Sequence, residues 1–209
     1  MILFIDPGNR AQHNDALDQY FTLRKKVFVD RLGWVEGRDD GRETDRFDEM
    51  FNVYVLYVDE ETGKVVGGVR LMPTTSDTLL HSVWPDMLDD RRDYRSPRMW
   101  ETTRFCVDDE GFAYRKGNFI NRATFSLCLA VLDFSAVNNI TSIVAICEKQ
   151  FFDMTQTYGV SAELISRKTD ENGTDVCFGI CEASHDDPKI QWARHFMGTS
   201  APSTVGMMA

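Results

Sequence analysis

An arginine interrupts the apolar face of the first amphipathic segment. In residues 14–32, apolar side chains recur at spacings of three and four, which predicts a helix with one buried face. Arg24 lies on that face, three residues after Phe21 and four before Phe28. Its guanidinium can extend outward to solvent, or it can bind a carboxylate in a pocket walled by Phe28 and Trp34. This segment alone leaves both interpretations open.

More charged residues flank the two strands predicted next along the chain. Asp45 and Asp48 precede the first strand. They are either solvated loop acids or acids that hold an ammonium group or the arginine of the helix. Arg70 ends the second strand, after Gly67 and Gly68. Glycine in a strand marks close approach by a ligand or another backbone, or else a bulge.

The stretch WETTRF, residues 100–105, places Glu101 and Arg104 in an apolar strand, where unpaired charges are costly. Strict alternation points the two side chains to opposite faces, because their separation is odd. Either they serve different faces, or a bulge near Thr102 and Thr103 brings them together. A buried glutamate can act as a general base, and it can equally form a structural ion pair.

Taken together, these residues resemble the acyl-homoserine-lactone synthases, the autoinducer synthases of bacterial quorum sensing. The matching positions, in chain order, are Arg24, Phe28 and Trp34 in RKKVFVDRLGW, Asp45 and Asp48, Arg70 in VRLMPTT, and Glu101 and Arg104 in WETTRF. The segment WPDML, which precedes the third predicted strand, is also similar to the family. The resemblance is strongest over residues 20–107.

The resemblance implies a fold like that of the GNAT acetyltransferases and a two-step reaction. The amine of S-adenosylmethionine attacks an acyl thioester, carried on acyl carrier protein or on coenzyme A. The methionyl carboxylate then closes on its own γ-carbon and expels methylthioadenosine, which leaves an N-acyl-homoserine lactone. S-adenosylmethionine is a substrate here, so no cofactor and no metal are expected.

The resemblance also assigns roles, and the chemistry of each side chain agrees with its role. The attacking amine must lose a proton, and Glu101 is the expected base, acting directly or through one water. Ring closure mainly needs orientation, because the sulfonium leaves readily. The expected binding residues for S-adenosylmethionine are Arg24, Phe28, Trp34, Asp45 and Arg104, and the catalytic set adds Asp48 and Arg70 as supports. Which arginine contacts the substrate carboxylate is left open.

The acyl chain should occupy an apolar pocket between the central strands. The expected lining is Met99, Phe105, Ser126, Leu127, Val144, Ile146, Phe152 and Met154. Some family members that take 3-oxo chains have a threonine in the strand where this chain has Val144-Ala145-Ile146, so an unsubstituted chain is expected. Acetyltransferases bind the pyrophosphate of coenzyme A with a glycine-rich loop. The corresponding segment here, RKGN at residues 115–118, has only one glycine, so the choice between coenzyme A and a carrier protein as acyl donor is left open. Lys149 and the pair Arg167-Lys168 could meet an acidic carrier protein.

The elements that must position these residues follow an α/β order. The pattern predicts helices over 14–32, 119–138 and 148–159, and strands over 52–58, 64–72, 98–107, 141–147, 162–167 and 175–182. An exposed loop is expected over 35–49 and irregular structure over 73–97. This order is typical of a layered α/β domain with a mixed central sheet and helices on both faces, the GNAT-like α/β/α sandwich. One domain is expected over 1–197, with a flexible tail at 198–209.

Charge and composition exclude other classes. A net charge of −10 over 209 residues argues against nucleic-acid binding. No apolar run reaches the roughly 18 residues that a membrane span needs. The start MILFIDPGNR has no basic leader, so a cytoplasmic location is expected. The four histidines and five cysteines do not have the spacing of zinc ligands.

Two rival functions share part of this pattern. A GNAT-type N-acyltransferase acting on another amine would have the same fold but would not need Arg24, Phe28 and Trp34. A non-catalytic sensor domain would bind S-adenosylmethionine without turnover, and the presence of Glu101 argues against it.

Overall fold

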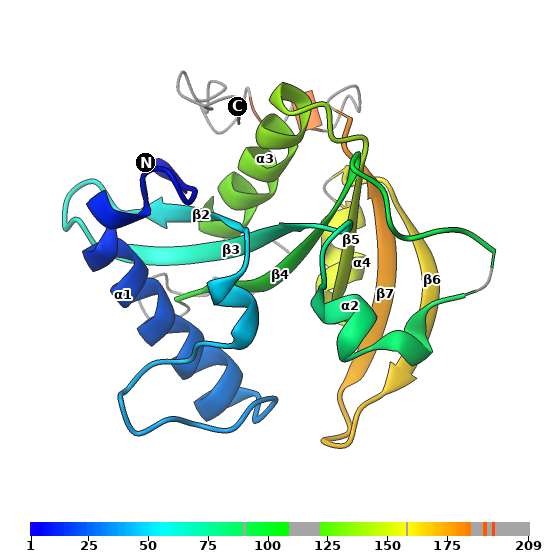
Figure 1. Ribbon diagram of the computed structural model, residues 1–209, viewed down its shortest axis with the longest axis horizontal. Helices are drawn as coiled ribbons and strands as arrows, with labels where there is room; N and C mark the ends of the chain where they lie inside the picture. The colour runs from blue at the N-terminus through cyan, green and yellow to red at the C-terminus, as the bar shows by residue number, and fades with distance from the viewer. Residues whose placement is uncertain (90, 109–121, 158, 185–189, 192–193, 195–209) are drawn as a thin grey trace. The chain divides into compact units, whose positions relative to one another are not determined.

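The computed structural model describes residues 1–89, 91–108, 122–157, 159–184, 190–191 and 194 (Figure 1). The chain divides into two compact units, of which unit 1 comprises Met1–Leu71 with Arg104–Cys128 and unit 2 comprises Met72–Thr103 with Leu129–Ala209. Three elements, β3, β4 and α3, have residues in both units. The single domain over 1–197 stays a prediction. The tail at 198–209 lies outside the described residues.

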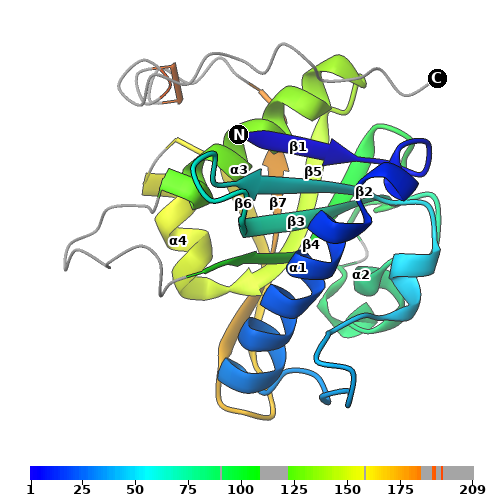
Figure 2. The ribbon, with the colours of Figure 1, turned by 90° about the vertical axis from the view of Figure 1, so that its left-hand side faces the viewer.

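Unit 1 is built on antiparallel strands. Its elements are β1 (Ile2–Ile5), α1 (Asn14–Arg24), a π-helix (Lys25–Arg31), β2 (Val53–Val58), most of β3 (Val65–Pro73), the end of β4 (Met99–Val107) and the start of α3 (Arg122–Val137). The strand order is β1-β2-β3-β4, and β2 pairs antiparallel with both β1 and β3. Figure 2 shows α1 lying across β2 and β3.

Two consecutive glycines of β3 show how helices cover both faces of unit 1. A Cβ on Gly68 would lie 2.6 Å from the Tyr20 ring of α1, and a Cβ on Gly67 would lie 3.1 Å from Leu127 of α3. Consecutive strand residues point to opposite faces, so α1 and α3 cover opposite sides. Protein side chains, not a ligand, occupy the space that these glycines leave. The pairing of β2 with β3 is also irregular beside Gly67, so a bulge, one of the two explanations for these glycines, is present as well.

Unit 2 carries the parallel pairing. Its elements are α2 (Leu79–Ser82), the first part of β4, β5 (Ser142–Glu148), α4 (Lys149–Thr157), β6 (Ala162–Thr169) and β7 (Asp175–Glu182). The strand order is β4-β5-β7-β6. β4 runs parallel to β5, whereas β5–β7 and β7–β6 are antiparallel, so the sheet is mixed.

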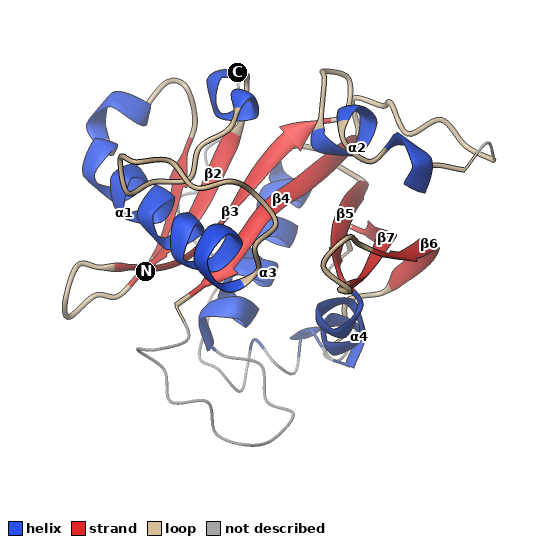
Figure 3. Ribbon diagram, turned by 90° about the horizontal axis from the view of Figure 1, so that it is seen from below, coloured by secondary structure: helices blue, strands red, loops and turns tan. Residues whose placement is uncertain are grey.

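Helices cover both faces of unit 2 as well. Glu101 pairs in register with Val144, and its carboxylate accepts from the backbone N–H of Leu80 in α2, which places α2 over that face. On the opposite face, α4 places Phe152 against Gly179 of β7. Figure 3 shows α4 beside β5 and β7. Helices thus cover both faces in each unit, and the parallel pairing of β4 with β5 makes the seven-stranded sheet mixed, so the predicted mixed sheet with helices on both faces is confirmed.

Most predicted elements are present, with three differences. The strand β1 was not predicted, because a four-residue apolar run is too short to show alternation. The helix expected over 14–32 ends as an α-helix at Arg24 and continues as a π-helix. The irregular stretch 73–97 contains the short helix α2. Within the described part of the chain, no helix combines the length and apolar character needed to cross a bilayer.

Candidate active site

Arg24 is fully buried in unit 1 and is held by carboxylates. Its side chain is 0% exposed, which excludes extension to solvent. Nε donates to Glu43 Oε2 at 2.6 Å, and Nη1 and Nη2 donate to the two oxygens of Asp48 at 2.8 and 3.0 Å. Burial alone would lower the pKa of Arg24, but the charge and hydrogen bond of Asp48, together with Tyr20 and Glu43, outweigh it and raise the pKa well above its ordinary value. The guanidinium is therefore a permanent cation that holds acids in place.

Arg70 is the second fully buried arginine of unit 1. Nη1 donates to Asp45 Oδ1 at 2.6 Å and to Asp48 Oδ1 at 2.7 Å, and Nη2 donates to Asp45 Oδ2 at 3.0 Å. Arg70 faces these acids because it pairs in register with Tyr54, on the face of β3 that α1 covers. Burial alone would raise the pKa of Asp48, but the charges of Arg70 and Arg24 outweigh it and lower that pKa far below its ordinary value.

Asp45 and Asp48 also build the turn that carries them. Asp45 caps the 3-10 turn Arg46–Glu49, where its Oδ1 accepts from the N–H of Phe47 at 2.9 Å. Asp48 Oδ2 accepts from the N–H of Asp45 at 2.8 Å, so the two side chains form a reciprocal capping box. The reading of these residues as solvated loop acids is wrong, because they pair with buried arginines.

Glu43 belongs to the same cluster and was not predicted. Its side chain is 4% exposed, although it lies in the stretch 35–49 that was expected to be exposed. Its backbone N–H donates to the Phe21 carbonyl at 3.0 Å, which ties the loop to α1. Glu43 bonds both Arg24 and Arg104. No signal in the sequence set it apart, because an acid in a polar, glycine-bearing stretch is usually solvated.

Arg104 is the arginine of this cluster that keeps some exposure, 10% against 0% for Arg24 and Arg70. Its Nε donates to Glu43 Oε2 at 3.1 Å, and Nη2 lies 2.8 Å from Asp45 Oδ2. The centre of the guanidinium lies 5.4 Å from the centre of the Phe28 ring. Asp45 is the most exposed acid of the cluster, at 18%.

The backbone of Arg104 is left-handed, with φ at 55°. For a side chain larger than glycine this conformation is sparsely populated and costs about 1–3 kcal/mol. It interrupts the regular geometry of β4, so strict alternation does not hold through this residue. A bulge near Thr102 and Thr103 was one of two alternatives for this strand, and the irregular backbone lies at Arg104.

The π-helix sets the position of the two rings. After Arg24 the backbone hydrogen bonds follow the i→i+5 pattern. The N–H of Leu32, for example, donates to the carbonyl of Val27 at 3.0 Å. Phe28 lies within this π-helix and remains buried, in the same apolar cluster as Leu17 and Tyr20 of α1. The Phe28 and Trp34 rings are stacked, with centroids 6.2 Å apart and planes 26° apart. Trp34 Nε1 is buried and has no hydrogen-bond partner among the described residues.

In unit 2, Glu101 is fully buried on an apolar face of the sheet. Its Oε1 accepts from the backbone N–H of Leu80 at 2.9 Å. The same face carries a cluster of apolar side chains that includes Leu80, Val144 and Phe178. One carboxylate oxygen is thus fixed by a main-chain donor in a water-poor environment, an arrangement suited to proton transfer.

The predicted acyl-pocket residues are divided between the two units. Met99, Val144 and Ile146 pack in the apolar cluster on the Glu101 face of unit 2. Phe152 lies on the other face, against Gly179, and so does not belong with these three. The remaining predicted residues, Phe105, Ser126 and Leu127, lie in unit 1, and Met154 lies on α4.

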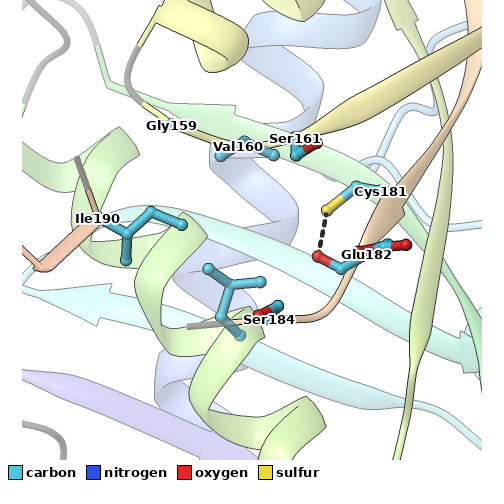
Figure 4. A pocket seen from close by; sticks show the side chains of 8 residues that line it. Gly159, Val160, Ser161, Cys181, Glu182, Ser184 and Ile190 are labelled. Carbon is cyan, nitrogen blue, oxygen red and sulfur yellow. Dashed lines mark hydrogen bonds between the residues drawn. The ribbon is translucent and has the colours of Figure 1, made fainter. Parts of the chain in front are cut away.

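A small pocket of about 200 Å³ opens elsewhere in unit 2 (Figure 4). Its lining is Leu132, Gly159, Val160, Ser161, Cys181, Glu182, Ser184 and Ile190. None of the predicted acyl-pocket residues lines it. The pocket is therefore separate from the Glu101 face.

The basic residues suggested for carrier docking are paired with acids. Lys149 donates to Asp153 at 2.6 Å, and Arg167 donates to Asp175 through Nε at 2.6 Å. Lys168 donates to Asp86 and lies over the Trp84 ring. The surface around these three is of mixed charge rather than basic. The segment RKGN at 115–118 lies outside the described residues.

Comparison with known proteins gives concordant results. A family model described as autoinducer synthase matches residues 9–189. An acyl-homoserine-lactone synthase of Rhizobium radiobacter is 31% identical over 151 residues, covering 72% of this chain and 71% of that protein. An isovaleryl-homoserine lactone synthase of Bradyrhizobium diazoefficiens is 35% identical over 149 residues, covering 71% of this chain and 64% of that protein.

Comparison with solved structures also finds an acyl-homoserine lactone synthase, here by similarity of fold. The CoA-dependent acyl-homoserine lactone synthase BjaI, determined with MTA, superposes with a TM-score of 0.82 at 26% identity. The superposition covers 98% of this chain and 95% of that chain. The match therefore includes residues of both units.

Proposed function

This chain belongs to the autoinducer synthase family, and we propose that it makes an N-acyl-homoserine lactone from S-adenosylmethionine and an acyl thioester. The observation that carries the proposal is the ion cluster of unit 1, in which three arginines and three acids are held together beside a stacked pair of rings. The cluster leaves one cation and one acid partly exposed, and S-adenosylmethionine presents one carboxylate and one ammonium.

The exposed members of the cluster are the ones we assign to the substrate. Arg104 would bind the methionyl carboxylate, and Asp45 would hold the ammonium group. Phe28 and Trp34 would bind the adenosyl and sulfonium parts through ring stacking and cation–π attraction. Arg24 and Arg70, both 0% exposed, would act only by fixing the acids.

The first chemical step is amine acylation. The amine must be neutral before it attacks the thioester carbonyl, and we assign the proton to Glu101, directly or through one water. A new amide bond forms as the C–S bond breaks, and the thiol leaves as the second product. The hydrogen bond from Leu80 supports this role because a main-chain donor fixes one carboxylate oxygen in place.

The second step is lactonisation, which needs orientation more than activation. The carboxylate oxygen attacks the γ-carbon, the C–S bond to the sulfonium breaks, and neutral methylthioadenosine leaves. A substrate held at its carboxylate and at its adenosyl end is restricted to folded conformers, and such restriction can supply about 7–11 kcal/mol of a barrier. The rigid ion cluster supports this positioning role.

Two observations favour coenzyme A over a carrier protein as the acyl donor. The structural relative BjaI is CoA-dependent. The basic groups Lys149, Arg167 and Lys168 are each paired with an acid, which weakens their attraction for an acidic carrier. We propose that Met99, Val144 and Ile146 line the acyl site and that the chain is unsubstituted at its 3-position. We also place the enzyme in the cytoplasm, where its substrates are made.

A product assay tests the function. The purified chain is incubated with S-adenosylmethionine and a panel of acyl-CoA and acyl-carrier-protein thioesters, and products are identified by mass spectrometry. We expect lactone and methylthioadenosine to appear together, with acyl-CoA thioesters turned over faster.

Each rival function predicts a different outcome of this assay. Thiol release with an added amine but without methylthioadenosine would indicate an N-acyltransferase that acts on another amine. Binding of S-adenosylmethionine with no turnover across the panel would indicate a sensor domain. Either result would overturn the proposed function.

A further inference from the structure

The main chain of Arg104 is held by a side chain from α1. Tyr20 is fully buried, and its hydroxyl donates to the carbonyl oxygen of Arg104 at 2.7 Å. That carbonyl belongs to the residue whose φ of 55° departs from the strand geometry of β4. The hydrogen bond therefore joins the first helix to the irregular point of β4, within unit 1.

We propose that Tyr20 is a positioning residue for Arg104, because its hydroxyl holds the main chain in the left-handed conformation that aims the guanidinium at Asp45 and Phe28. The proposal rests on the proposed function, in which Arg104 binds the substrate carboxylate. A left-handed backbone at a non-glycine residue persists only where its surroundings fix it. Of the surroundings, Tyr20 supplies the hydrogen bond to the carbonyl oxygen.

The sequence of β3 provides the space for this contact. The Tyr20 ring lies over Gly68, where an added Cβ would come within 2.6 Å of the ring and of the Leu56 side chain. Any other residue at position 68 would displace the ring and its hydroxyl. The Gly68 position, whose purpose the sequence left open, is thereby explained by the path of Tyr20 to Arg104.

The rest of the environment keeps the phenol in place and protonated. The ring packs edge-on against Tyr54, with centroids 5.8 Å apart, and the Arg24 guanidinium lies 5.6 Å from its centre. Burial raises the pKa of Tyr20 well above its ordinary value, and the nearby Cys106 adds to the effect. The hydroxyl therefore remains a donor throughout the working pH range.

The substitution Tyr20→Phe tests the proposal, because it removes the hydroxyl and keeps the ring on Gly68. Steady-state rates are measured first with S-adenosylmethionine varied at a saturating concentration of acyl thioester. They are then measured with the thioester varied at a saturating concentration of S-adenosylmethionine. We expect the KM for S-adenosylmethionine to rise about fivefold and the KM for the thioester to stay close to wild type, while the melting temperature falls by a few degrees because the Arg104 carbonyl loses this donor. The matched control is Tyr57→Phe on β2, for which both KM values should be unchanged.

A structural role alone would give a different pattern. Loss of folded protein lowers kcat and leaves both KM values unchanged, because the surviving molecules are normal. That pattern, or an equal rise in both KM values, would overturn the proposal. Gly68→Ala offers a second variant, and combining it with Tyr20→Phe should raise the KM for S-adenosylmethionine no further than Gly68→Ala does. If Gly68→Ala does not fold, Tyr20→Phe decides the question alone.

Failure of the proposed function is separable from failure of this proposal. If the wild-type chain forms no lactone, calorimetric titration with S-adenosylmethionine replaces the kinetic comparison. About fivefold weaker binding by Tyr20→Phe would then support the positioning role, and equal affinity would overturn it. Absence of binding by the wild type would overturn both.

Discussion

Replacing Glu101 with glutamine is expected to lower the rate of amine acylation by about 10²- to 10⁴-fold, the usual contribution of a general base. Glutamine keeps the shape of the side chain and a carbonyl oxygen that can accept from the N–H of Leu80. The fold and the affinity for S-adenosylmethionine should therefore be retained, since the residues assigned to that substrate lie in unit 1. Single-turnover thiol release measures the acylation step, and calorimetry measures the affinity.

The matched control for this substitution is Glu163→Gln on β6. Glu163 is exposed and pairs with Arg92 on the surface, so the same change of charge should leave acylation at the wild-type rate. Unchanged acylation in Glu101→Gln would remove Glu101 from the base role. A parallel loss of affinity for S-adenosylmethionine would assign the residue to binding instead.

Asp48→Asn is expected to destabilise the protein by about 3–5 kcal/mol at pH 7, because it removes one partner of a buried ion cluster. Asp48 accepts from both Arg24 and Arg70 and also from the hydroxyl of Tyr54. Asparagine has similar volume but no charge, so the buried guanidinium groups lose their shared counter-ion. Urea unfolding of wild type and variant measures the difference in the free energy of unfolding.

The pH dependence of this difference has a definite sign. The neighbouring arginines overcome the effect of burial and lower the pKa of Asp48 in the folded state. The wild type therefore gains stability from this group above the unfolded pKa of about 3.9 and loses the gain as the pH falls below that value. The advantage of wild type over Asp48→Asn should be full at pH 7 and should shrink in acid below about pH 4.

The control for stability is Asp30→Asn, which removes an exposed pair with Lys25 in the same unit. Its effect should be small, because exposed ion pairs contribute little. If Asp48→Asn lowers the free energy of unfolding by less than about 1 kcal/mol, the size found for exposed pairs, the cluster does not stabilise the fold as a buried ion network. If the stability difference between wild type and Asp48→Asn grows as the pH is lowered, the predicted direction of the pH dependence is wrong.

The sequence predicted the members of the cluster better than their arrangement. Arg24 and Arg104 stood out because charged side chains in apolar segments need partners, and the family resemblance then selected them together with Asp48. The sequence could not show which acid pairs with which arginine, because those pairs join residues that are far apart in the chain and meet only in the fold. Arg24 does not extend to solvent: it is buried and holds Asp48, a pairing that was one of the alternatives for the acids, and it also holds Glu43, which was not predicted.

Local irregularity accounts for the features that the sequence did not show. Regular periodicity assumes one pitch along a helix, and the π-helix after Arg24 breaks that assumption just where Phe28 is placed. The left-handed backbone of Arg104 likewise breaks the alternation of β4. Glu43 escaped notice because loop acids are usually solvated. All three departures lie in the candidate site, where strained and irregular backbone is concentrated.

The central claim is that Arg104 contacts the substrate and Arg24 does not. Calorimetric titration of S-adenosylmethionine into Arg104→Lys and Arg24→Lys, both shown to be folded at the temperature used, tests it directly. We predict that Arg104→Lys binds about tenfold or more weakly, because lysine cannot reproduce the guanidinium contacts, and that Arg24→Lys loses stability but binds nearly as the wild type does. Folded Arg24→Lys that binds as weakly as Arg104→Lys would contradict the claim.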